Sequence, residues 1–130
     1  MSHQVMKRIA DVPWEGHFMD EGSRIKWIYT NEKDGTPMTV MLIELQEGIS
    51  LPDHRHVNQP DLIYVVSGKA TMYIEGQGEF PAEAGCVVMV PPNTTHAVRN
   101  VTEKFVMYNV FSPAIPYKEG IRSQDKVSQN

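Results

Sequence analysis

Short runs of β-branched and aromatic residues, broken by glycine, proline and asparagine, follow one another along most of this chain. Residues 25–30 and 39–45 are two such runs, and the intervening segment 31–37 is rich in turn formers. The other predicted strands cover 62–66, 70–75, 86–90, 96–99 and 105–111, with a hairpin turn at Ser67-Gly68 and another tight turn over 76–78. No stretch of twelve or more residues has helical periodicity, so the pattern predicts an all-β sandwich or barrel.

The length of the chain suits one domain. A chain of 130 residues buries roughly two-thirds of its unfolded surface without disulfides or metals as staples. Since no linker, repeat or low-complexity tract interrupts it, residues 1–130 are expected to form a single domain. The polar tail, about 118–130, is expected to be mobile.

Charge and cysteine content restrict the partners. A net charge of -4 and a pI near 5.7 argue against nucleic acid or an anionic membrane surface, which would require a basic face. Cys86 is the only cysteine, so an internal disulfide is impossible, and its apolar neighbours suggest a small buried side chain. Without an apolar leader at the N-terminus or a run long enough to span a bilayer, we expect a cytoplasmic protein.

Two histidines stand one residue apart, and a carboxylate follows. In an extended chain alternate side chains point the same way, so His54 and His56 would share a face, with Asp61 five residues further on. Taken alone, such a pair is more often an ordinary surface or core feature than a metal clamp. The rest of the chain has to decide between these interpretations.

The wider spacing resembles that of a known superfamily. The segment GISLPDHRHVNQPDLIYVVSG (48–68) and the segment GCVVMVPPNTTHAVRN (85–100) are similar to the two signature motifs of the cupins. All but two motif positions agree in register over the motif core 48–100. The exceptions are Asp61, where glutamate is usual, and Asn93, where glycine is usual.

The resemblance implies a small single-domain metal-binding cupin, folded as a jelly-roll β-barrel (a double-stranded β-helix). It implies that one metal is held by His54, His56, Asp61 and His96. Three imidazoles and a carboxylate suit one divalent transition metal, Fe, Mn, Ni, Cu or Zn, and suit calcium poorly. It also implies a homodimer formed through the N-terminal strands, with residues 25–29 offering an edge.

The two departures from the cupin motifs differ in their expected effect on the metal site. Asparagine tolerates the left-handed backbone that glycine would supply, so Asn93 is a mild change. Asp61 is one methylene shorter than glutamate. Either its strand begins closer to the metal, or it binds through water, or the site is weakened.

Four further residues are candidates for a substrate pocket: Asn109, Gln59, Tyr73 and Met107. Alternation puts Asn109 on one face with Phe105, Met107 and Phe111, either as a polar group in the pocket or as a partner for a neighbouring strand end. Gln59 would support Asp61, replace it as ligand or face solvent. Tyr73 would donate a proton or simply pack. Met107, like Met41, Met72 and Met89, would fill the core or line the pocket.

The closing segment 108–115 resembles that of small cupins that linearise unsaturated uronates. Those relatives read Asp-Val-Phe-Ser-Pro, followed two residues later by arginine. This chain has Asn109 in place of the acid and Ile115 in place of the arginine. Asparagine is no general base and isoleucine binds no carboxylate, so that activity is not expected.

Three functions are compatible with these features. The first is a metal-dependent enzyme for a small organic molecule, with a dioxygenase favoured over a lyase or isomerase because the interior is apolar. The second is a non-catalytic cupin that binds a sugar or small organic acid. The third is a barrel whose metal only ties strands together. The first function predicts an open pocket beside the metal. The second predicts a pocket without a base, and the third predicts a closed, dry site.

Overall fold

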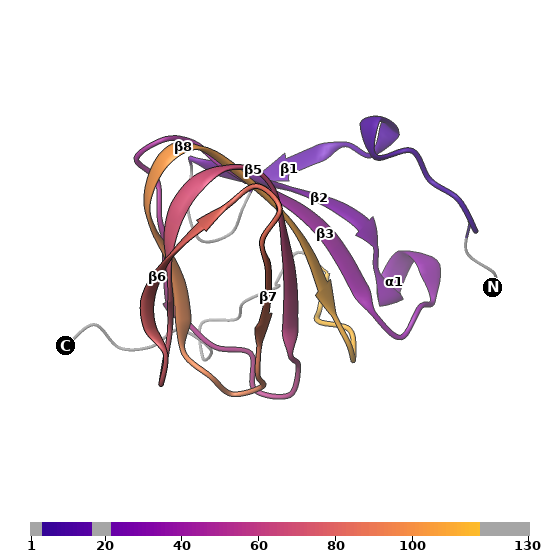
Figure 1. Ribbon diagram of the computed structural model, residues 1–130. Coiled ribbons are helices and arrows are strands. Elements are labelled where there is room, and N and C mark those ends of the chain that lie inside the picture. The colour runs from indigo at the N-terminus through magenta and orange to yellow at the C-terminus, as the bar shows by residue number, and fades with distance from the viewer. Residues whose placement is uncertain (1–3, 17–21, 118–130) are drawn as a thin grey trace.

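The computed structural model describes residues 4–16 and 22–117, and the tail predicted to be mobile lies outside them (Figure 1). Within these residues the chain forms eight strands and two short helical turns. The strands are β1 (Trp14–Gly16), β2 (Ser23–Tyr29), β3 (Thr39–Leu45), β4 (Leu51–His54), β5 (Asp61–Ile74), β6 (Gly78–Glu83), β7 (Val87–Val90) and β8 (His96–Phe111). The helices are η1 (Ile9–Asp11) and α1 (Asn31–Asp34). No helix in this part of the chain is long and apolar enough to cross a membrane.

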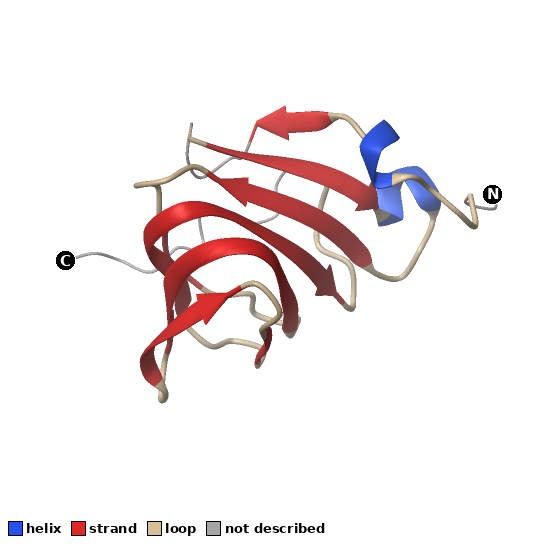
Figure 2. Ribbon diagram, turned by 45° about the horizontal axis from the view of Figure 1, so that its top comes forward, coloured by secondary structure: helices blue, strands red, loops and turns tan. Residues whose placement is uncertain are grey.

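All strand pairs are antiparallel, and the order β1-β2-β3-β8-β5-β6 is completed by β4 on β8 and β7 on β5. The long strands β5 and β8 bend, so the sheet curls into a barrel while β1, β2 and β3 extend from one side (Figures 1 and 2). This is the predicted all-β jelly-roll architecture.

The hairpin predicted at Ser67-Gly68 is wrong, because residues 62–66 and 70–75 belong to one strand, β5. Pairing with β8 shifts register around Ser67 instead of reversing. Gly68 has φ +92°, and a Cβ there would overlap the carbonyl oxygen of Lys104 on β8. The glycine therefore permits a bulge and a close backbone approach inside a strand, not a turn.

Strand β8 also joins two segments that the sequence separates, 96–99 and 105–111. Asn100 has φ 51° within it, a left-handed residue that interrupts the regular pleat. Asn93 has φ 55°, which confirms that asparagine here adopts the backbone expected of the usual glycine. The turn predicted over 31–37 contains α1, capped by a 2.9 Å hydrogen bond from the Lys33 N–H to the Thr30 hydroxyl.

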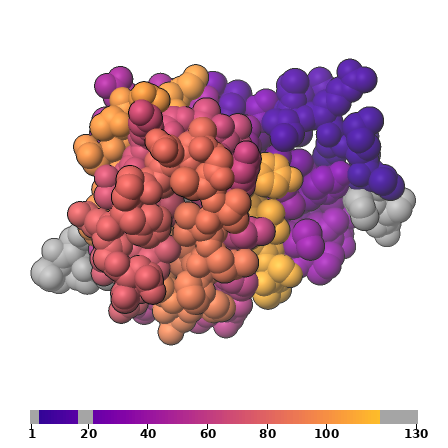
Figure 3. Space-filling model, in the orientation of Figure 1, coloured from indigo at the N-terminus to yellow at the C-terminus, as the bar shows by residue number. Residues whose placement is uncertain are grey.

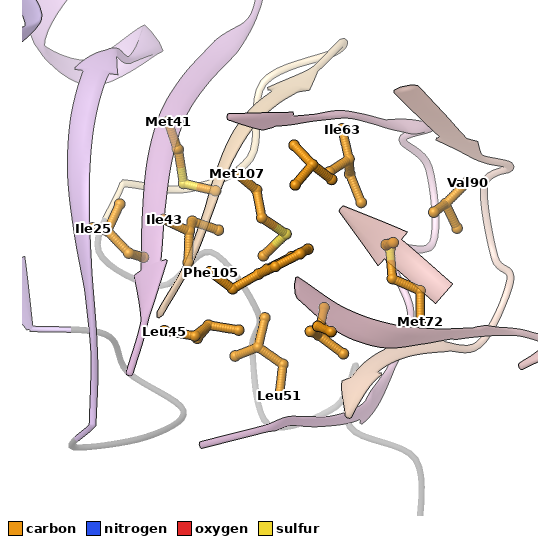
Figure 4. Packing of buried hydrophobic residues seen from close by; sticks show 14 of the residues in the cluster. Ile25, Met41, Ile43, Leu45, Leu51, Ile63, Met72, Val90, Phe105 and Met107 are labelled. Atoms are coloured by element: carbon orange, nitrogen blue, oxygen red, sulfur yellow. The ribbon is translucent and has the colours of Figure 1, made fainter. Parts of the chain in front are cut away.

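The barrel interior is filled by large apolar side chains, and Met41, Ile43, Phe105 and Met107 meet at its centre (Figure 4). The predicted alternation on β8 is confirmed, because Phe105, Met107, Asn109 and Phe111 are all buried. Met89 is different. It is 57% exposed on the outside of β7, so its assignment to core or pocket is wrong. Cys86 is partly buried and packs against the core.

Strand β2 is not a bare edge. Its first half pairs with β1, and the N-terminal segment contacts its second half. The ammonium of Lys7 donates to the Ile28 carbonyl at 2.7 Å, and the Tyr29 hydroxyl donates to the Gln4 carbonyl at 2.9 Å. The edge proposed for dimer formation over residues 25–29 is thus largely covered by the chain itself.

Candidate metal centre

Three histidines meet at one end of the barrel. His54 is the last residue of β4, His56 follows it in the loop, and His96 is the first residue of β8. His54 and His96 are direct cross-strand partners in the β4–β8 ladder. All three are buried, and a potential ligand atom of each lies within 4.8 Å of those of the other two. The predicted convergence of these histidines is therefore present.

Backbone carbonyls fix the orientation of two of the rings. The Nδ1 of His54 lies 2.7 Å from the Pro52 carbonyl oxygen, and the Nδ1 of His96 lies 2.9 Å from that of Thr94. A carbonyl only accepts, so each Nδ1 donates its proton and the Nε2 of each neutral ring carries the lone pair. The Nε2 of His96 is buried and has no hydrogen-bond partner within the described residues.

Asp61, the first residue of β5, lies beside this group without belonging to it. Its Oδ2 is 3.5 Å from the Nε2 of His96, within ion-pair distance but without a hydrogen bond. Its Oδ1 accepts a 3.0 Å hydrogen bond from the Nδ2 of Asn109. Both side chains are almost fully buried, with 3% and 2% of their surface exposed.

Strand register explains the contact between Asp61 and Asn109. Asp61 is opposite Phe111 in the β5–β8 ladder, and Asn109 is opposite Ile63, so the two polar residues are diagonal neighbours on the interior face. The bend of β8 then brings His96 to the same place. In a straight strand the Cα atoms of His96 and Asn109 would be roughly 43 Å apart.

A small cavity adjoins these residues. The space within it that is open to the centre of a water molecule is about 20 Å³, enough for about one water-sized group. The cavity is lined by Met41, Ile43, Leu51, His54, His56, Asp61, Ile63, His96, Val98, Met107, Asn109, Phe111 and Ile115. The three histidines and Asp61 are the ionisable members of this lining, and it includes no lysine or arginine.

Two of the four residues predicted to form a substrate pocket line the cavity, and two do not. Met107 and Asn109 line the cavity, whereas Gln59 and Tyr73 do not. The amide of Gln59 donates to the Ala114 carbonyl at 3.3 Å. The ring of Tyr73 lies 4.4 Å from the guanidinium of Arg99, on the opposite face of β5 from the buried Met72 and Ile74.

Some contacts at the site were not predicted from the sequence. The ring of Phe111 packs edge-on against His56, with 4.7 Å between centroids. Ile115 reaches the cavity because its backbone is held by Thr39, whose hydroxyl oxygen is 3.0 Å from the Ile115 N–H. Alternation along β8 gave the face of Phe111 but not its contact with His56, and the resemblance of the closing segment gave the position of Ile115 but not its contact with Thr39.

The donor set fits a transition metal. Three imidazoles whose potential ligand atoms lie within 4.8 Å of one another, with the Nε2 of His96 buried and without a hydrogen-bond partner among the described residues, are what a divalent metal of the Fe to Zn series prefers. The carbonyls that orient His54 and His96 are the outer contacts usual for ligating histidines. The three histidines could therefore hold one metal ion.

Solved structures with the same fold share little sequence with this chain. KdgF from Halomonas sp. has a TM-score of 0.68 and 20% identity, over 80% of this chain and 90% of that one. Ectoine synthase from P. lautus has a TM-score of 0.76 and 15% identity, over 89% and 83%. A protein described as a predicted oxalate decarboxylase from Thermotoga maritima has a TM-score of 0.72 and 16% identity, over 84% and 99%. At these identities the likeness shows the fold alone.

Sequence comparison shows the family. An uncharacterised protein of Aquifex aeolicus (strain VF5) is 30% identical over 104 residues, which cover 78% of this chain and 82% of that protein. The family model of the cupin domain matches residues 41–111, from the middle of β3 to the end of β8. This match contains the three histidines, Asp61 and Asn109. The chain is therefore a member of the cupin family.

Proposed function

We propose that the protein is a metal-dependent enzyme that acts on a small organic molecule in the cavity beside the three histidines. The observation that carries the proposal is the Nε2 of His96, a buried lone pair without a hydrogen-bond partner that lies among the cavity-lining groups. Leaving such an atom unsatisfied costs about 1–3 kcal/mol. A bound metal removes that cost.

In this proposal His54, His56 and His96 hold one divalent transition metal, and Asp61 is a fourth ligand or an adjacent carboxylate. When bound, the metal supplies Lewis acidity or redox chemistry. The protein orients the imidazoles through the Pro52 and Thr94 carbonyls. Asn109 holds Oδ1 of Asp61, so Oδ2 is the oxygen turned toward His96.

A dioxygenase is favoured over a lyase or isomerase. Elimination and isomerisation need a positioned general acid or base. Apart from the three histidines, Asp61 is the ionisable residue in the described cavity lining, and it is engaged by Asn109. A dioxygenase places both atoms of O₂ in the organic product and needs no further reductant. Most other cavity-lining side chains are aliphatic or thioether groups, which suit apolar O₂.

The same scarcity of acid–base groups supports a second candidate, a non-catalytic cupin that binds a small sugar or organic acid. The two candidates differ in turnover. Purified protein would be stripped of metal, reloaded separately with Fe(II) and Zn(II), and supplied with small enols, diols and diketones while O₂ is measured. A dioxygenase would take up O₂ with iron and none with zinc, whereas a lyase or isomerase would consume the organic substrate without O₂ uptake. Ligand binding without turnover under either metal would favour the non-catalytic candidate.

We also propose a homodimer, now through a different surface. Four exposed residues, which we call the outer patch, lie side by side on β5 and β7: Tyr64, Val66, Val87 and Met89, between 44% and 64% exposed. Burial raises the pKa of the adjacent Tyr108, so its phenol stays neutral beside this patch. Val5 and Met6 are more exposed still, at 91% and 68%, on the N-terminal segment that stands out from the surface (indigo in Figure 3). A second copy would cover such apolar surface.

Two broader expectations remain proposals. One is that residues 1–130 form a single cupin domain, supported by the membership of β1 to β8 in one sheet. The other is a cytoplasmic location, which suits a chain whose one cysteine, Cys86, cannot form an internal disulfide.

A further inference from the structure

We propose that the side-chain oxygen of Asn109 selects the ligand of this cavity by accepting a hydrogen bond from one of its O–H or N–H groups. The inference rests on the proposed function, because it requires a small molecule bound beside a metal held by the three histidines. It goes further by assigning a specific atom and a hydrogen-bond role to Asn109, which is not one of the four predicted metal ligands, and by restricting the chemistry of the substrate.

The orientation of the amide is fixed by its neighbour. The carboxylate of Asp61 accepts hydrogen bonds, so the Nδ2 of Asn109 must face it, and the 3.0 Å contact between Nδ2 and Oδ1 shows that it does. The Oδ1 of Asn109 is then directed elsewhere. It is buried and has no hydrogen-bond partner within the described residues.

The strand neighbours of Asn109 offer no donor to this oxygen. The direct cross-strand partners of Asn109 are Met41 on β3 and Ile63 on β5, and both also line the cavity. On β8 itself the residues on the same face are Met107 and Phe111. None of these side chains carries a hydrogen-bond donor. Because buried acceptors are nearly always satisfied, the missing donor must come from whatever occupies the cavity.

These features define a class of ligand. It is small, since only about 20 Å³ of the cavity is open to the centre of a water molecule, and it is mostly apolar, since the cavity walls are mostly apolar. It binds the metal through oxygen and carries an O–H or N–H group beside that oxygen. Without lysine or arginine in the lining, a carboxylate remote from the metal would lack a counter-ion. Small hydroxy-ketones, enols and diols meet these conditions, and uronates do not.

The test uses two probes that differ in one donor. Acetohydroxamate binds metals through two oxygens and keeps an N–H, whereas N-methylacetohydroxamate binds in the same way and lacks it. The full chain would be loaded with Co(II), and the affinity of each probe would be measured from the visible absorption of the metal. Wild-type protein should prefer acetohydroxamate about five- to tenfold beyond the ratio for Co(II) in water, the effect of one neutral hydrogen bond.

The variant Asn109→Leu has a similar volume and no acceptor, so it should lose this preference while elemental analysis shows retained Co(II). Asn109→Ala repeats the test if the leucine variant does not fold. Equal preference in wild type and variants, or failure of either probe to bind wild-type protein that contains Co(II), would overturn the inference and leave the metal centre standing. Absence of bound Co(II) in wild-type protein would instead refute the proposed function, and the inference with it.

Discussion

The amide of Asn109 donates a 3.0 Å hydrogen bond to the carboxylate of Asp61, although 48 residues separate them in the chain. The contact joins two residues at which this chain departs from the sequences it resembles. Asp61 is the shortened acid of the first motif, and Asn109 replaces the acid of the closing strand. The contact occupies one carboxylate oxygen and leaves the other 3.5 Å from His96. The hydrogen bond from Asn109 therefore fixes the orientation of the Asp61 carboxylate, whether or not Asp61 binds the metal.

Removal of a histidine should remove the metal. We expect His54→Ala and His96→Ala to lose stoichiometric metal after dialysis, because each takes away one of three converging imidazoles. Elemental analysis measures this. Gln59→Ala is the control and should keep its metal, since the Gln59 amide contacts the Ala114 carbonyl and not the cavity. Unchanged metal in both histidine variants would refute the assignment.

Asp61 should matter less than the histidines. We expect Asp61→Glu to keep the metal and Asp61→Ala to weaken its affinity by about 10- to 100-fold, the effect of losing a supporting group. His56→Ala should empty the site. Competition with a chelator gives the affinities. If Asp61→Ala empties the site while His56→Ala does not, Asp61 is the stronger ligand.

The protein should not linearise 4,5-unsaturated uronates efficiently. Asn109 cannot exchange a proton at neutral pH, and loss of a general acid or base lowers rates by about 10²- to 10⁴-fold. Ile115 lines the cavity and stands where the uronate-linearising cupins that the closing segment resembles have arginine, and Arg99 is paired with Asp53 and Glu79 at 2.7 and 2.9 Å. The measurement is loss of unsaturated galacturonate with wild-type protein and with Asn109→Asp. Robust wild-type turnover would mean that another residue transfers the proton.

The outer patch should hold a dimer together. Light scattering of wild-type protein at micromolar concentration is expected to give a dimer, and the double variant V87K/M89K a monomer, because two buried ammonium groups would face apolar surface. Val57→Lys, at a residue 46% exposed outside the patch, is the control. A monomeric wild type would reject the dimer, and a dimeric V87K/M89K would reject this surface.

Gly68 should tolerate no side chain. Gly68 and Gly76 both have positive φ, +92° and +88°, so an alanine at either carries a similar backbone strain. Only at Gly68 does the added Cβ overlap the Lys104 carbonyl, whereas nothing lies within 4 Å at Gly76. We expect Gly68→Ala to lower the free energy of unfolding by at least about 2 kcal/mol more than Gly76→Ala. Urea denaturation of both variants measures the difference, and equal losses would show that the strand can shift.

Local pattern predicted much of the fold. The strand over 39–45 has the predicted bounds, the alternation along 105–111 is the observed one, and Asn93 adopts the left-handed backbone. These features depend on neighbours in the chain, on propensity and on the two-residue period of a strand. The motif spacing likewise predicted that His54, His56 and His96 would converge, and they do.

Other features depend on contacts between distant segments. Ser67-Gly68 has the composition of a turn, and only the approach of Lys104 makes it a bulge within β5. The bond from Asn109 to Asp61, the aliphatic Ile115 at the cavity and the edge of Phe111 against His56 follow from the β5–β8 register and the bend of β8. Periodicity gives the face on which a side chain lies. Which residue it meets is decided by the closing of the barrel, because only closure sets the register between strands far apart in sequence.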